Sequence, residues 1–159
     1  MTIAYVGIGA NLDDPRTHVL DALRELDQLP HTRLVKRSSL YCSAPIGYAT
    51  QPDFINAVAQ LETGLPAERL LAELQEIEAR HGRSRSFANA PRTLDLDLLL
   101  FGNSEMNTPA LKIPHPRMHE RAFVLAPLVE ISPDVKIPGR GAAQPFMDST
   151  RNQKVERIG

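Results

Sequence analysis

Two aspartates separated by a single residue are the clearest chemical signal in the sequence. Asp95 and Asp97 lie in the segment 93–101, in which every second residue from 94 to 100 is leucine. This alternation is typical of a strand with one buried face, so both carboxylates should point the same way, about 6–7 Å apart. Such a pair can bind one Mg²⁺ ion each, or share two ions about 4 Å apart across a transferring phosphate. An isolated Asp-x-Asp pair is more often a solvated strand face, so its neighbours have to be considered.

Basic side chains gather in the segments that flank the two aspartates. They are Arg83, Arg85, Arg92, His115, Arg117 and Arg121. A planar guanidinium group can bind phosphate oxygens through two parallel hydrogen bonds and stabilise charge that develops during phosphoryl transfer. Any one arginine alone is more often surface charge, and His115 between two prolines fits a structural role as well as a catalytic one. Together with the carboxylates, these cations predict a site for a metal-bound triphosphate. The sequence has no P-loop motif, so side chains and metal must bind the phosphates.

A second group of residues could bind a flat heterocycle. Phe54, Phe123, Asn56 and the segment 44–47 could form an apolar slot with an amide group that reads the edge of a ring. From composition alone, core packing is the more common role for both phenylalanines. The slot therefore depends on where the fold places these residues.

The hydrophobic pattern predicts the elements that must position both groups. Strand patterns cover residues 3–9, 33–41, 54–61 and 93–101, while helical patterns begin after Asp14-Pro15 and cover residues 66–81 and 122–131. Residues 43–52 are typical of a long loop, and residues 82–91 form a polar, glycine-bounded segment. The order strand, helix, strand, strand, helix, strand favours an α+β sandwich with two helices on one face of a mainly antiparallel sheet.

Two glycines near the N-terminus need a separate interpretation. Gly7 and Gly9 look like the opening of a dinucleotide-binding loop, but the third glycine position is Leu12. We interpret them as a tight turn from the first strand to the first helix.

Length and composition restrict the remaining possibilities. The 159 residues predict a single domain, residues 1–159, in which residues 139–159 form a peripheral C-terminal segment. The net charge of −1 provides no overall field for nucleic acid or an anionic membrane, and no apolar stretch approaches the ~20 residues that cross a bilayer. Cys42 is the only cysteine, which excludes an internal disulfide and a multi-cysteine zinc site. We expect a cytoplasmic monomer whose partners are small molecules, with no nucleic acid or membrane partner.

Four motifs connect these residues to a known family. They are residues 5–11 (YVGIGAN), 51–56 (QPDFIN), 91–97 (PRTLDLD) and 114–128 (PHPRMHERAFVLAPL). In their order and spacing, the chain up to about residue 138 resembles the 6-hydroxymethyl-7,8-dihydropterin pyrophosphokinase family. The resemblance implies a ferredoxin-like two-layer α+β sandwich with long active-site loops. It also implies transfer of pyrophosphate from ATP to the pterin hydroxymethyl group, with release of AMP, in folate biosynthesis.

The resemblance also assigns roles by position. Asp95 and Asp97 would bind two Mg²⁺ ions, and Arg83 and Arg92 would contact the phosphates and support the transition state. Residues expected to contact ATP are Gln75, Glu78, Arg85, Leu98, His115 and Arg121, with adenine held largely by backbone near Leu98. Residues expected to contact the pterin are Ser43, Ala44, Pro45, Ile46, Gly47, Phe54, Asn56 and Phe123.

Two other functions remain open from the sequence. A ferredoxin-like RNA-binding module would present aromatic residues and a basic sheet face, and the two aspartates argue against it. A two-metal nuclease or nucleotidyl transferase could use the same aspartates, but the slot residues would then have no explanation. No general base is assigned, and Asp97 is only one candidate for it. The arginine-containing segment 82–91 is expected to close over ATP.

Overall fold

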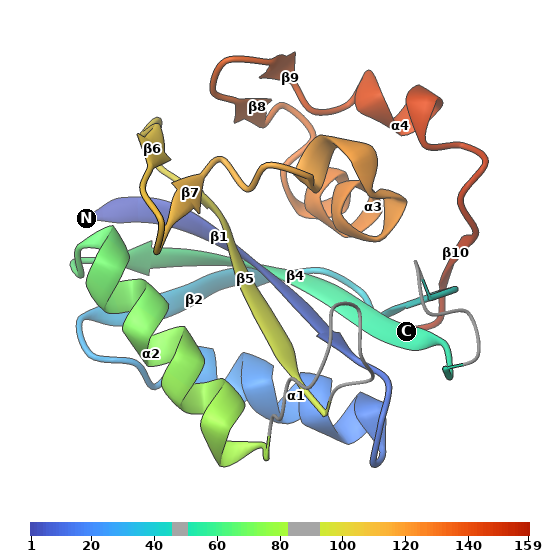
Figure 1. Ribbon diagram of the computed structural model, residues 1–159, viewed down its shortest axis with the longest axis horizontal. Coiled ribbons are helices and arrows are strands. Elements are labelled where there is room, and N and C mark those ends of the chain that lie inside the picture. The colour runs from blue at the N-terminus through green and yellow to red at the C-terminus, as the bar shows by residue number, and fades with distance from the viewer. Residues whose placement is uncertain (46–50, 83–92) are drawn as a thin grey trace.

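The computed structural model describes residues 1–45, 51–82 and 93–159 (Figure 1). The expected site residues Ile46, Gly47, Arg83, Arg85 and Arg92 lie outside these ranges. The first elements are β1 (Thr2–Ala10), α1 (Pro15–Leu26), β2 (Thr32–Arg37), β3 (Tyr41–Ser43), β4 (Phe54–Thr63), α2 (Ala67–Arg80) and β5 (Asp95–Phe101). They follow the predicted order, except that the segment expected as one strand at 33–41 is divided into β2 and β3.

The rest of the chain adds short elements and a third long helix. These are β6 (Met106–Asn107), β7 (Lys112–Ile113), the 3-10 helix η1 (Met118–Glu120), α3 (Ala122–Ile131), β8 (Lys136–Ile137), β9 (Gly141–Ala142), α4 (Phe146–Ser149) and β10 (Val155–Arg157). The helix predicted at residues 122–131 is therefore confirmed. Among the residues that the structure describes, no helix is long and apolar enough to span a bilayer.

The main sheet has the order β10-β3-β4-β1-β5, with β2 also pairing β4. Every pairing in this sheet is antiparallel. The central path from β5 through β1 and β4 to β2 and β3 is the ferredoxin-like order. The predicted α+β class with a mainly antiparallel sheet is confirmed.

Helices cover both faces of this sheet (Figure 1). On one face, α1 and α2 bury leucines such as Leu26 and Leu74 against strand residues that include Ile8 and Leu96. On the other face, α3 packs through residues such as Leu125 in a separate apolar cluster that includes Tyr5 of β1. The predicted sandwich of a mainly antiparallel sheet with helices packed on it is confirmed, and α3 covers its second face. The buried residues of α3 are spread around its circumference, so this helix needs cover from more than one side.

The interpretation of Gly7 and Gly9 as a strand-to-helix turn is wrong. Both glycines lie inside β1, and the chain turns only afterwards, where Asp13 and Asp14 adopt left-handed φ angles of 53° and 63°. Pro15 then opens α1, as the sequence predicts. Because they have no side chains, the two glycines leave backbone uncovered on one face of β1.

Candidate active site

Asp95 and Asp97 open strand β5 on the face that α3 covers. The intervening Leu96 and the following Leu98 are buried under α1 and α2, and successive strand side chains point to opposite faces. Both aspartates are half-buried. The prediction that Asp95 and Asp97 share one face of the strand is therefore confirmed.

Glycines stand opposite both aspartates on the neighbouring strand. Asp95 is paired with Gly9 and Asp97 with Gly7 across β1. Directly opposite residues of an antiparallel pair share a face, so no β1 side chain stands directly opposite either carboxylate. The described residues contain no group of three or more His, Cys, Asp or Glu that could hold a metal unaided. A pair of carboxylates fits Mg²⁺, which commonly takes its other ligands from water and substrate phosphates.

The same row of the sheet continues to Asn56 on β4. Gly9 pairs with Asp95 on one side and with Asn56 on the other. Because neighbouring strands are about 4.8 Å apart, Asp95 and Asn56 are separated by roughly 10 Å of backbone with no side chain between them. A Cβ atom at Gly9 would lie 3.3 Å from Asn56 Oδ1 and 3.8 Å from the Phe54 ring. We infer that the missing side chain at Gly9 leaves a hollow above the backbone, between the carboxylates and the residues expected to bind pterin.

The far side of this hollow is formed by β3 and β4. Ser43 pairs with Phe54, and the Ser43 Oγ atom accepts a 2.6 Å hydrogen bond from Asn56 Nδ2. Ser43 and Asn56 are buried, Pro45 is half-buried and Ala44 is exposed. The structure therefore brings together Ser43, Phe54 and Asn56, as the slot requires.

Phe123 and Arg121 lie at the start of α3. The Arg121 guanidinium carbon lies 5.5 Å from the centre of the Phe123 ring, a cation–π distance. Phe123 is half-buried and packs on the cluster under α3. This contact connects a residue expected at the phosphates to one expected at the pterin.

His115 lies within the electrostatic influence of Asp95 and has a lowered pKa. Burial, followed by the charge of Arg121, lowers the pKa of His115 to about 4, while Asp95 pulls the pKa in the opposite direction. His115 Nδ1 accepts a 3.2 Å hydrogen bond from the Arg117 backbone N–H, so we assign the ring proton to Nε2. His115 can therefore donate a hydrogen bond without carrying a charge.

The expected ATP residues of α2 and β5 differ in exposure. Gln75 is exposed, whereas Glu78 is 7% exposed and its Oε2 accepts a 2.7 Å hydrogen bond from Leu96 N–H. The Leu98 side chain is buried in the core under α1 and α2, so only its backbone can face a ligand. Glu78 is thus fixed to the strand segment between the two aspartates.

Two polar residues near the site were not singled out from the sequence. Asn11 Nδ2 donates hydrogen bonds to Gln51 Oε1 at 2.7 Å and to the Pro52 carbonyl oxygen at 3.0 Å. Both Asn11 and Gln51 are buried. They tie the end of β1 to the segment that enters β4. Their positions could have indicated this role, because Asn11 ends the motif at 5–11 and Gln51 begins the motif at 51–56.

One family matches most of the chain. The family described as 7,8-dihydro-6-hydroxymethylpterin-pyrophosphokinase (HPPK) matches residues 5–133. The 2-amino-4-hydroxy-6-hydroxymethyldihydropteridine pyrophosphokinase of Pseudomonas aeruginosa is 50% identical over 154 residues, which cover 97% of this chain and 95% of that protein. The enzyme of the same name from Haemophilus influenzae is 47% identical over 138 residues, covering 87% of this chain and 86% of that protein.

Solved structures give the same fold at low identity. A crystal structure of HPPK-DHPS in complex with substrates superposes with a TM-score of 0.73 at 13% identity, over 93% of this chain and 43% of the other. Wild-type HPPK-DHPS of Plasmodium falciparum superposes with a TM-score of 0.70 at 13% identity, over 94% of this chain and 43% of the other. The chain spans less than half of these longer proteins, and the likeness to them shows the fold alone.

Proposed function

The chain belongs to the 7,8-dihydro-6-hydroxymethylpterin-pyrophosphokinase family, and we propose that the hollow between Asp95 and Asn56 is its reaction centre. The activity is pyrophosphorylation of hydroxymethyldihydropterin in folate biosynthesis, with ATP as the other substrate. The observation that carries the proposal is the row Asp95, Gly9 and Asn56 on one face of three neighbouring strands. It offers metal ligands at one end and a polar edge for a ring at the other.

Asp95 and Asp97 bind the magnesium of ATP in this proposal. Their support is the shared face, the half-buried position and the absence of opposing β1 side chains. When bound, two Mg²⁺ ions neutralise the phosphate oxygens and hold the reacting groups in line. Arg83 and Arg92, with Arg85 and Arg121, would grip the phosphates through charge-assisted hydrogen bonds.

The pterin ring occupies the slot between Phe54 and Phe123. Asn56 is held in place by Ser43, and backbone groups of Ser43 and Ala44 would help to read the edge of the heterocycle. The resemblance adds the backbone of Ile46, which lies outside the described residues. A ring seated over Gly9 would direct its hydroxymethyl group toward the carboxylates. The lack of a Gly9 side chain makes room for that approach.

The nucleotide lies along the outer edge of β5. Leu96 N–H points away from β1 toward Glu78, and the two-residue period gives the Leu98 backbone groups the same direction. Adenine would bind there, near Gln75 and Glu78, and His115 Nε2–H would donate to the phosphate chain.

Positioning and electrostatics carry most of the catalysis. The pterin hydroxyl oxygen attacks the β-phosphorus of ATP, the bond from that phosphorus to the α–β bridging oxygen breaks, and AMP leaves while the hydroxyl proton is released. No side chain is assigned as an obligatory base. The cytoplasmic location and the monomeric state stay predictions.

The nucleotide product tests the reaction directly. Protein, ATP, Mg²⁺ and the reduced pterin alcohol should yield AMP, and only when pterin is present. ADP would indicate an ordinary kinase, and cleavage of a phosphodiester without pterin would favour the nuclease alternative.

The Asp97→Ala variant tests the metal site. Removing this ligand should lower turnover by more than the about 10- to 100-fold lost when a residue that only orients a metal ligand is removed, with the protein still folded. Glu62→Ala is the matched control, because Glu62 is a partly buried carboxylate at the opposite end of β4, paired with Arg33. Full activity of Asp97→Ala would disprove the metal assignment.

A further inference from the structure

The C-terminal segment lies outside the part of the chain that the family model matches. That match ends at residue 133, whereas the chain continues through α4 to β10 and Gly159. Figure 1 shows this last part running past α3 and returning to the side of the sheet where β3 lies. Residues 153–157 contact two of the three elements that carry the proposed pterin slot, namely α3 and β3.

One contact is made at the start of α3. The residue at the N-cap, Arg121, gives no side-chain cap, and the first N–H groups of a helix have no partner within it. Gln153 supplies one, since its Oε1 accepts a 2.9 Å hydrogen bond from Ala122 N–H. Its Nε2 also donates to the Glu120 carbonyl oxygen at 2.7 Å. The Gln153 side chain, from a distant segment, thus holds the residues on both sides of Arg121 in the turn that leads to Phe123.

The second contact is made along β3. In β10, Val155 pairs with Ser43 and Arg157 pairs with Tyr41, so β10 extends the sheet beyond β3. The Ile158 backbone N–H adds a 2.8 Å hydrogen bond to the Leu40 carbonyl oxygen. The strand that ends in Ser43 is therefore held on both edges, by β4 and by β10.

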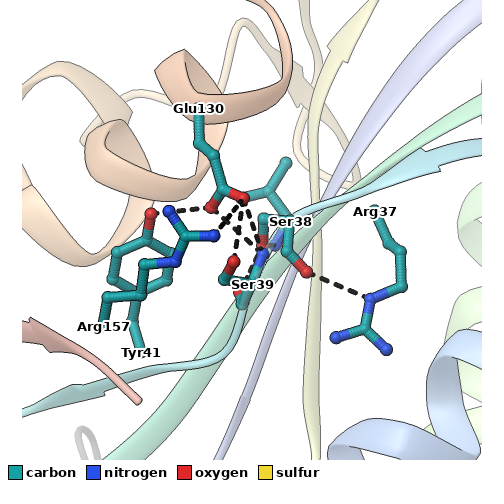
Figure 2. Close-up of polar contacts among 7 residues, drawn as sticks. Arg37, Ser38, Ser39, Tyr41, Glu130 and Arg157 are labelled. Atoms are coloured by element: carbon teal, nitrogen blue, oxygen red, sulfur yellow. Dashed lines mark hydrogen bonds and ion pairs between the residues drawn. The ribbon is translucent and has the colours of Figure 1, made fainter. Parts of the chain in front are cut away.

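A carboxylate on α3 links this helix to the chain at the start of β3, as Figure 2 shows. Glu130 accepts hydrogen bonds from Ser39 N–H at 3.0 Å, from Ser39 Oγ at 2.9 Å and from the Tyr41 hydroxyl at 2.7 Å. Arg157 adds an ion pair at 3.7 Å, which is weak because the arginine is largely exposed. Burial would raise the pKa of Glu130, but the bonds from Tyr41 and Ser39 outweigh it and keep the pKa below its ordinary value. The carboxylate thus stays charged and keeps α3 attached to β3 at neutral pH.

We propose that residues 153–157 act as a brace that sets the geometry of the pterin slot, with Gln153 as a positioning residue for Phe123. The brace fixes one wall through the first turn of α3 and the other wall through the strand that carries Ser43. Neither Gln153 nor β10 needs to touch the substrate. The inference rests on the proposed slot, and it predicts an effect on pterin binding that is separate from ATP binding.

The Gln153→Ala variant tests the brace. It should raise the KM for the pterin alcohol by about tenfold, the size expected when hydrogen bonds that orient a binding group are lost, and leave the KM for ATP within about twofold. Gln153→Glu keeps an acceptor for Ala122 N–H but loses the donor to Glu120, so it should give a smaller rise. It also serves if Gln153→Ala does not fold.

Arg151→Ala is the matched control for this segment. Arg151 is exposed and pairs with Asp148 three residues earlier, so its loss should leave both KM values unchanged. An unchanged pterin KM in both Gln153 variants, or an equal rise in both KM values, would overturn the brace. Phe123→Ala separates the two proposals. If Phe123→Ala leaves the pterin KM unchanged, the proposed slot is wrong. If Phe123→Ala raises the pterin KM while both Gln153 variants leave it unchanged, the brace alone is rejected.

Discussion

At the scale of single residues, the site depends on a side chain that is missing. Gly9 stands between Asp95 and Asn56, and any larger residue there would fill the hollow that joins them. Strand propensity alone would favour a β-branched residue at this position, since glycine weakens a strand interior. We propose that glycine is needed here because the ligand approaches the backbone closely.

The Gly9→Ala variant measures this requirement. Its Cβ would meet Asn56 Oδ1 at 3.3 Å, so the amide must shift by a few tenths of an ångström and pterin should bind at least about tenfold more weakly. The unfolding free energy should change by less than about 1 kcal/mol, because alanine also restricts the unfolded chain. Steady-state kinetics and denaturant unfolding give both quantities.

Gly7→Ala is the matched control for that experiment. The three atoms nearest to a Cβ atom at Gly7 would all belong to the Leu99 side chain, the closest at an ordinary contact distance of 3.5 Å. Pterin affinity should then stay close to that of the unmodified protein. If Gly7→Ala and Gly9→Ala weaken pterin equally, the hollow beside Asn56 has no special role.

At the scale of elements, the strand that carries the aspartates is held by a helix. Glu78 on α2 accepts a hydrogen bond from Leu96 N–H, which lies between Asp95 and Asp97. Strand β5 is paired on its other edge with β1. The backbone that presents the two carboxylates is thus fixed from both sides, and we propose that Glu78 supports catalysis by positioning this strand.

The Glu78→Ala variant should lose both stability and turnover. It leaves the Leu96 N–H without this acceptor, which costs about 1–3 kcal/mol for a buried donor, and it loosens the metal-binding strand. Thr63→Val is the comparison, because Thr63 is fully buried and accepts from Leu65 N–H at the opposite end of the sheet. The two variants should be destabilised to a similar degree. Equal turnover in both would show that Glu78 acts on stability alone.

At the scale of the whole molecule, His115 connects folding to pH. Its pKa in the folded protein is lowered from 6.5 to about 4, first by burial. Between these values the unfolded chain binds a proton that the folded protein does not, so acid favours unfolding in this window. The contribution of His115 to stability is fully present above pH 6.5 and is lost as the pH falls toward 4.

Denaturant unfolding of the metal-free protein at several pH values measures this linkage. His115→Asn offers an oxygen that can replace Nδ1 as acceptor for Arg117 N–H, but it does not titrate. The free energy of unfolding should therefore fall less steeply in this variant between pH 6.5 and 4. Identical slopes in the two proteins would contradict the lowered pKa.

Much of the fold and part of the site could be predicted from local pattern. The family and its activity, the antiparallel α+β class and the helix at 122–131 are confirmed. The turn assigned to Gly7 and Gly9 was wrong, since a glycine pair inside a strand and one in a turn give the same local signal. The face of the sheet that α3 covers could not be predicted, because an apolar helix reveals that it is buried but not against which face.

That Asp95 and Asp97 share a face could be predicted from the chain alone, because the two-residue period of a strand is a local property of the backbone. In contrast, the folded structure was needed to show that Gly9 lies between Asp95 and Asn56, and that Gln153 caps the helix that carries Phe123. Both results depend on the register of strands and on contacts between segments far apart in the chain. A local pattern does not encode such pairings, since they are set by the packing of the whole sheet with the helices on its two faces.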